Sequence, residues 1–122
     1  MILADSSVWV DHLRHDNPQL MHLLKTEMVL CHPFVVGEIA LGILSPRDII
    51  LRMLSQLRRS TVATDAEVME LIEKHSLFGC GVGYVDVHLL ASVKITPGSV
   101  LWTFDKRLHQ VSQRLGLSMK GT

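Results

Sequence analysis

The chain has 122 residues, of which 12 are basic and 12 acidic, so its formal net charge at pH 7 is zero. This length predicts one domain, residues 1–122, and an apolar share of 48% is enough to form a hydrophobic core. The balanced charge argues against a general polyanion-binding protein, and the lack of a long apolar run argues against a membrane protein.

Short apolar strands and helices alternate along the first half of the sequence. Asn17-Pro18 and Pro33 favour helix starts, and Ser45-Pro46 predicts an N-cap followed by proline in the first helical turn. The predicted elements are a strand at 1–5, helices at 6–14 and 17–26, a strand at 28–31, and helices at 33–44 and 45–58.

The same alternation continues in the second half. Thr64 and Glu67 are spaced as a capping box at a helix start, "GCGVG" predicts a flexible loop, and Pro97-Gly98 predicts a turn. The predicted elements are a strand at 61–63, a helix from 64, a helix at 84–94, a strand at 99–102 and a helix at 105–115. This order predicts an α/β fold whose parallel sheet is covered by helices on both sides.

The N-terminus and the two cysteines indicate a compartment. The first ten residues, "MILADSSVWV", lack the basic segment of a secretory signal. Cys31 and Cys80 lie far apart and outside any Cys-x-x-Cys motif, as is typical of buried thiols in a reducing compartment. We therefore expect a cytoplasmic protein with no membrane association.

Four of the twelve acidic residues stand alone in apolar surroundings. Asp5 is the only charge in residues 1–10, Glu38 in 33–44 and Asp86 in 77–93, and Asp105 is the first charge after 95. The other eight lie at helix starts or in charged neighbourhoods, where a structural role explains them. A lone charge in a buried segment is costly unless a partner neutralises it.

Periodicity and strand ends suggest that these four acids meet. Glu38 shares a helical stripe with Phe34 and Leu41, and Asp86 shares one with Leu89, so both stripes are expected to face the core. The remaining two acids follow apolar strands at their carboxyl ends, where parallel sheets bind ligands. We expect one shared pocket. Taken singly, the aspartates could cap helices, and Glu38 could pair with a buried arginine.

Clustered carboxylates favour the binding of a divalent metal ion. They repel one another unless a cation neutralises them, and oxygen ligands suit Mg²⁺ or Mn²⁺ rather than zinc. Such a site can activate water for attack on a phosphodiester. We expect Ser7 and Thr103 to hold the carboxylates or touch phosphate, and Lys106 and Arg107 to hold the substrate backbone.

Four motifs resemble those of PIN-domain ribonucleases. They are "ILADSSVWVDHL", "VVGEIALG", "GVGYVDVHLLAS" and "LWTFDKRL", and they look most like the motifs of VapC toxins from bacterial VapBC toxin–antitoxin pairs. The resemblance covers essentially the whole chain, in order. It implies a PIN-like three-layer α/β/α sandwich with a short parallel sheet.

The resemblance also implies an activity and partners. It implies the toxin of a type II toxin–antitoxin system, a Mg²⁺- or Mn²⁺-dependent endoribonuclease that cleaves RNA, forms a homodimer and is inhibited by a VapB-type antitoxin. It implies catalytic and metal-binding roles for Asp5, Glu38, Asp86 and Asp105, with Asp5 and Asp86 as direct ligands and the other two acting through water or at a second ion. Phe104 departs from the family pattern, in which a polar or basic residue is common at that position.

Other classes of protein would require different residues at these positions. A phosphoacceptor receiver domain would have paired acids near the first strand, but Asp5 stands alone. A hydrolase with an aspartate nucleophile would have Asp-x-Asp there, but the third position is Ser7. A catalytically silent PIN-like adaptor that binds RNA or protein is the main alternative. Its signature would be the loss of an acid, and all four are present.

Overall fold

A four-stranded parallel sheet in the order β3-β2-β1-β4 forms the centre of the computed structural model, which describes residues 1–121. The strands are β1 (Ile2–Ala4), β2 (Val29–Cys31), β3 (Arg58–Arg59) and β4 (Val100–Trp102). Leu3 of β1 pairs with Leu30 of β2 and with Leu101 of β4. The first strand of the chain is therefore an inner strand of the sheet, paired on both sides, and all three leucines are buried.

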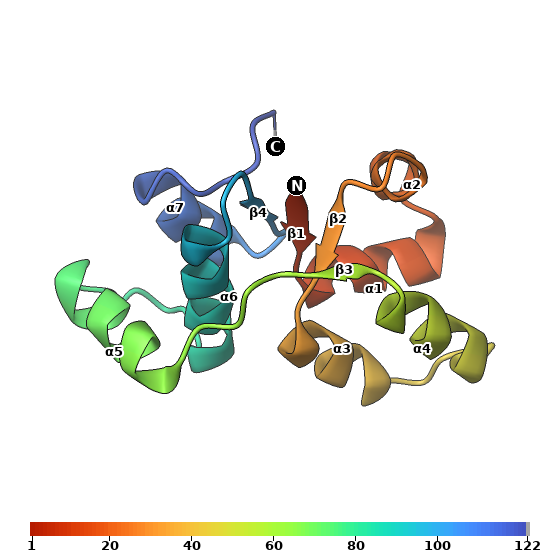
Figure 1. Cartoon of the computed structure of the whole chain (residues 1–122), viewed down its shortest axis with the longest axis horizontal. Helices are drawn as coiled ribbons and strands as arrows, with labels where there is room; N and C mark the ends of the chain where they lie inside the picture. Colours follow the sequence, from red (N-terminus) through yellow and green to blue (C-terminus); the bar gives the residue numbers. More distant parts are fainter. Residues whose placement is uncertain (122) are drawn as a thin grey trace.

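Helices cover both faces of this sheet. Among residues 1–121 they are α1 (Ser6–His15), α2 (Pro18–Lys25), α3 (Pro33–Ala40), α4 (Arg47–Ser55), α5 (Asp65–Lys74), α6 (Tyr84–Ile95) and α7 (Lys106–Arg114). Figure 1 shows α5, α6 and α7 to the left of the strands and α1, α2 and α4 to the right. The predicted α/β/α arrangement is confirmed.

The third strand lies outside its predicted range. It is Arg58–Arg59 rather than 61–63, and it pairs with β2 at the edge of the sheet. Both arginines are exposed, as charged residues on edge strands usually are. Thr61 is drawn away from the sheet, because its N–H donates to Thr96 Oγ1 (3.0 Å) and its carbonyl accepts from Ser92 Oγ.

The segment between α3 and α4 also differs from the prediction. Helix α3 ends at Ala40, four residues early, and the Arg47 guanidinium donates to the carbonyl of Ala40 (2.7 Å). That bond satisfies one of the acceptors left open at a helix end. Helix α4 begins at Arg47, so Pro46 occupies the N-cap position, without a side-chain hydrogen bond, and Ser45 does not cap the helix. The Ser45-Pro46 peptide bond is cis.

The capping box predicted from Thr64 and Glu67 is confirmed. The side chains of Thr64 and Glu67 form the capping box of α5, with bonds of 3.1 and 2.9 Å. Cys31 is buried and Cys80 half-buried, and neither forms a disulfide. No helix within residues 1–121 is long and apolar enough to cross a membrane. The last residue of the expected domain, Thr122, lies outside the described residues.

Candidate active site

The first and last acids of the set meet at the carboxyl ends of β1 and β4. Asp5 directly follows β1, and its N–H donates to the carbonyl of Trp102 at the end of β4 (3.0 Å). Thr103 is the next residue after β4. Strand pairing thus places residues 98 positions apart side by side.

Hydroxyl groups hold both oxygens of the Asp5 carboxylate. Ser7 Oγ donates to Oδ1 and Thr103 Oγ1 to Oδ2, each at 2.5 Å. The N–H of Val8 also donates to Oδ1 (3.3 Å), which makes Asp5 the N-cap of α1. The capping interpretation is therefore correct for Asp5. A carboxylate oxygen has about two acceptor positions, so Oδ2 keeps one of them free.

Burial leaves the charge of Asp5 poorly compensated. The residue is only 5% exposed. Loss of hydration raises the pKa of the carboxyl, the hydrogen bonds from Ser7, Thr103 and Val8 lower it in part, and the negative charge of Asp86 raises it further. The net pKa is above its ordinary value. A cation next to Asp5 and Asp86 would offset both the burial and the repulsion.

Asp86 lies in the first turn of α6 on the face that the periodicity predicted. Leu89, Leu90 and Val93 are buried and Asp86 is half-buried. Its Oδ2 accepts from the N–H of Gly83 (3.0 Å), so Asp86 also closes the start of its helix. Oδ1 has no hydrogen-bond partner among residues 1–121. One oxygen is structural, and the other is available to a ligand.

Asp105 joins the same group through Thr103. Its N–H donates to Thr103 Oγ1 (3.0 Å), the hydroxyl that donates to Asp5. Asp105 is exposed and caps α7 by accepting from Leu108 N (2.9 Å) at Oδ1. Thr103 therefore fixes the two acids relative to one another.

Glu38 lies on a different face of its helix from the one predicted. Val35 and Ile39 form the buried side of α3, whereas Phe34 is 38% and Leu41 90% exposed. Glu38 is exposed with them, so the expectation that its stripe faces the core is wrong. A helix of only eight residues presents one narrow face to the core, and that face is taken by Val35 and Ile39.

Glu38 is not paired with another residue in the part of the chain that the structure describes. It lines a cavity of about 180 Å³ between α1 and the end of α3, together with Arg14 and Ile43. Within residues 1–121 its carboxylate forms no hydrogen bond or ion pair. The alternative of pairing with a buried arginine is not observed.

The four acids provide the ligand type that a hard divalent ion prefers, but the structure does not bring all four together. In the part of the chain that the structure describes, no three His, Cys, Asp or Glu side chains form a ready metal-binding group. Asp5 and Asp86 interact electrostatically, Asp105 is joined to Asp5 through Thr103, and Glu38 stays apart. The free donors are all carboxylate oxygens, the ligand type that Mg²⁺ and Mn²⁺ prefer.

Two exposed basic residues begin α7, beside Asp105. They are Lys106 and Arg107. The Arg107 side chain passes close to the loop before α6, since a Cβ added at Gly81 would lie 2.5 Å from its Nη1. Lys106 lines a cavity of about 300 Å³ that also contains Phe104 and Thr103. Lys106 thus lies beside Thr103, and Arg107 beside the loop that leads to Asp86.

Two buried histidines near this edge were not predicted. His32 follows β2 and accepts from the N–H of Phe34 at Nδ1 (3.0 Å), which caps α3. His88 contacts the rings of Phe34 and Tyr84, each with centroids 4.8 Å apart. Burial, together with the positive charge of neighbouring His88 and Arg59, lowers the pKa of His32 to about 4. The position of His32 after a predicted strand was the one signal available in the sequence.

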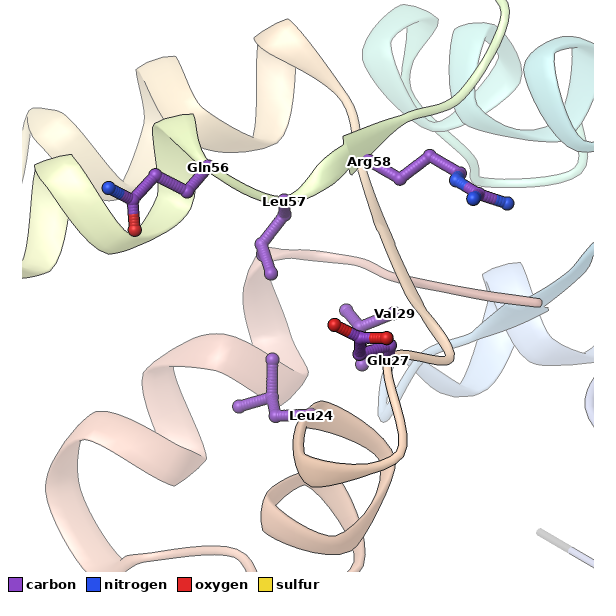
Figure 2. Close-up of a pocket in the computed structure, with 6 residues that line it drawn as sticks. All are labelled: Leu24, Glu27, Val29, Gln56, Leu57 and Arg58. Atoms are coloured by element: carbon purple, nitrogen blue, oxygen red, sulfur yellow. The ribbon is translucent and has the colours of Figure 1, made fainter.

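A larger cavity lies elsewhere on the sheet. Figure 2 shows its lining, which includes Glu27, Val29 and Arg58, and its volume is about 490 Å³. These residues stand where β2 and β3 begin, whereas Asp5 stands where β1 ends. The cavity is therefore at the opposite end of the parallel strands from the acids, and we do not assign the active site to it.

Comparisons with known proteins agree with this geometry. The chain matches the PIN domain family over residues 2–113. It is 42% identical over 119 residues to Ribonuclease VapC32 of Mycobacterium tuberculosis, in strain CDC 1551 / Oshkosh and in strain ATCC 25618 / H37Rv. The alignment covers 98% of this chain and 96% of each relative. The chain belongs to the PIN-domain family, and within it to the VapC group.

Proposed function

We propose that this chain is the endoribonuclease toxin of a type II toxin–antitoxin pair and cleaves RNA with the help of Mg²⁺ or Mn²⁺. The observation that carries the proposal is the buried Asp5 carboxylate, held by two hydroxyl groups beside Asp86 at the carboxyl edge of a parallel sheet. The extensive match to ribonucleases of the VapC group supports the choice of RNA as substrate.

The four acids would have different roles in ion binding, because their surroundings differ. Asp5 and Asp86 would hold the ion directly, because their charges interact and each keeps an oxygen with a free acceptor position. Glu38 and Asp105, which are exposed, would act through water or at a second ion. A bound divalent ion supplies Lewis acidity, which lowers the pKa of a water and offsets charge on the leaving oxygen.

The remaining residues would orient the reactants. Ser7 and Thr103 hold Asp5 in one orientation, so the carboxylate need not reorganise when substrate binds. Lys106 and Arg107 would contact the phosphates on either side of the cleaved bond. Because these contacts involve only the backbone, they would position any RNA without reading its sequence.

The biological setting follows from the same family. We propose that residues 1–122 form one domain, that the protein acts in the cytoplasm as a homodimer, and that a VapB-type antitoxin inhibits it. One hydrophobic cluster joins all three layers, which supports the single domain. Leu41, Ile43 and Ile49 are 90%, 103% and 58% exposed, and apolar surface of this kind is typical of a partner-binding region.

The mechanism predicts that Asp5→Asn and Asp86→Asn abolish RNA cleavage while the fold is retained. Each change removes a negative charge at the ion and keeps nearly the same shape. Cleavage of single-stranded RNA should be measured in Mg²⁺ and in excess EDTA, with thermal melting of each variant. Asp48→Asn, at an exposed position in the first turn of α4, is the matched control.

Three outcomes would contradict the proposal. Equal cleavage in excess chelator would exclude metal-dependent chemistry, and full activity of Asp5→Asn would exclude this site. RNA binding without cleavage by the wild-type protein would favour the adaptor function. Expression in a bacterial host should also arrest growth, and co-expression of the cognate antitoxin should relieve the arrest.

A further inference from the structure

We propose that the cavity beside Phe104 binds one unpaired nucleobase of the RNA, next to the cleaved bond, with the base stacked on the Phe104 ring. This inference rests on the proposed function and deepens it, because it assigns base recognition to a place on the molecule.

The backbone of Phe104 is tied to the catalytic carboxylate. Its N–H donates to Ser7 Oγ (2.9 Å), and the same hydroxyl donates to Oδ1 of Asp5 (2.5 Å). One hydroxyl therefore separates Phe104 from the acid that would hold the ion. A group stacked on this ring would belong to a nucleotide adjacent to the reacting phosphate.

The ring of Phe104 is held in place and yet open to solvent. It contacts the buried Trp102 in an edge-to-face arrangement, with centroids 5.7 Å apart and planes at 81°. Even so, 53% of Phe104 is exposed, so the core does not account for a large apolar side chain here. A pre-positioned, exposed aromatic ring is the surface on which unpaired bases stack in proteins that bind single-stranded RNA.

The adjoining cavity has the size and chemistry for a base. Its volume is about 300 Å³, at the small end of ligand-binding pockets. Beyond Phe104, Trp102 and Thr103, its lining includes Gln19, Lys106 and His109. An amide can both donate to and accept from the edge of a base, and the lysine can hold the attached phosphate.

Phe78 lacks this combination. Phe78 is 66% exposed in the loop after α5, but it has no hydrogen bond to the Asp5 network. It has the same side chain at comparable exposure, which makes it the matched control for Phe104.

Binding should be measured with the wild-type chain in excess EDTA, where metal-dependent cleavage is prevented. The probes are fluorescein-labelled single-stranded hexaribonucleotides of A, C, G or U and an abasic strand of equal charge. We expect Phe104→Ala to weaken binding of the preferred hexamer about 5- to 100-fold, the range of one lost stacking contact.

Three variants serve as controls. Phe104→Tyr and Phe104→Trp should restore the affinity for the hexamer, and Phe78→Ala should match the wild type. The abasic strand should bind Phe104→Ala and wild type equally.

A second measurement separates recognition from chemistry. Cleavage of a random-sequence RNA pool in Mg²⁺, with sequencing of the ends, should show that Phe104→Ala still cuts but with higher KM and weaker base preference. If wild type cuts and Phe104→Ala has unchanged affinity and preference, the base site is wrong and the proposed function stands. If Phe104→Ala loses only inhibition by the antitoxin, the ring is a protein contact and the inference fails. If wild type never cuts but binding still depends on Phe104, the base site stands and the proposed function fails.

Discussion

The Thr103 hydroxyl joins the two ends of the chain at the active site. It donates to Asp5 and accepts from the N–H of Asp105, so one atom sets the positions of two acids. Thr103 is 4% exposed, which keeps water from replacing these bonds. Its role is to position the acids, since it would act through Asp5 rather than on the substrate.

Replacing Thr103 by valine should lower both activity and stability. The change keeps the shape but removes the donor to Asp5, and outer partners of metal ligands typically contribute about 10- to 100-fold in activity or metal affinity. The lost buried hydrogen bond should cost about 1–3 kcal/mol of unfolding free energy. Urea unfolding and kcat/KM at several Mg²⁺ concentrations would measure both. Thr103→Ser should recover most of each loss, and if it does not, the hydroxyl is not the group that matters.

Patterns in the sequence predicted the positions of the two acids at strand ends better than the position of the acid in the middle of a helix. The positions of Asp5 and Asp105 could be predicted because an apolar strand ends directly before Asp5 and another ends shortly before Asp105. Glu38 was assigned to the wrong face because its helix is apolar nearly all round, so periodicity does not distinguish the Phe34 side from the Val35 side. His32 was missed because one neutral histidine among apolar residues resembles ordinary core.

At the scale of elements, the loop at 79–83 and the start of α7 are in close contact. Gly81 has a φ of +79°, which only glycine adopts without strain, and the Arg107 side chain packs where a Cβ would stand. This contact couples the loop that leads to Asp86 with a basic residue that we expect to bind RNA. The glycine is therefore needed both for the turn and for the place of the guanidinium.

Gly81→Ala should weaken RNA binding, whereas Gly98→Ala should not. Gly98 has a similar φ of +75°, but no atom lies within 4 Å of its added Cβ. Both substitutions should destabilise the fold by about 1–2 kcal/mol through backbone strain. Only Gly81→Ala should also displace Arg107. RNA affinity in EDTA and thermal melting would separate the two effects, and equal RNA affinity of the two variants would contradict the coupling.

At the scale of the whole molecule, the buried His32 should make stability depend on pH. The pKa of His32 is about 4 in the folded state, compared with about 6.5 when unfolded, so between these values only the unfolded chain binds a proton there. Stability should therefore fall as pH drops from about 6.5 to 4, by at most about 3 kcal/mol. Burial is the main cause of this low pKa, and the charges of His88 and Arg59 contribute to it.

Urea unfolding between pH 4 and 7 tests this dependence. His32→Asn keeps a capping acceptor at the start of α3 and removes the titrating group, so its stability should fall less over the same range. His15→Asn, at an exposed position, should behave as the wild type does. If His32→Asn shows the same pH dependence as the wild type, another group is responsible.

The alternation of strands and helices was enough to predict the architecture, but not every strand. β1, β2 and β4 are apolar and were placed to within two residues of their true ends. β3 consists of two arginines, and no local pattern in the sequence predicts a strand there. They form a strand because they pair with Leu30 and Cys31, which is a long-range interaction. The single bridge between Leu101 and Ser118, which extends the sheet beyond β4, is invisible for the same reason.

The place of β1 between β2 and β4 has a consequence for synthesis on the ribosome. Asp5 is among the first residues made, but Thr103 and Asp105 come about a hundred residues later, roughly 5–20 seconds at ordinary rates of translation. During that interval the nascent chain has neither the second neighbour of its central strand nor the hydroxyl that orients its first acid. The candidate active site is therefore complete only once the last strand and the start of α7 have been translated.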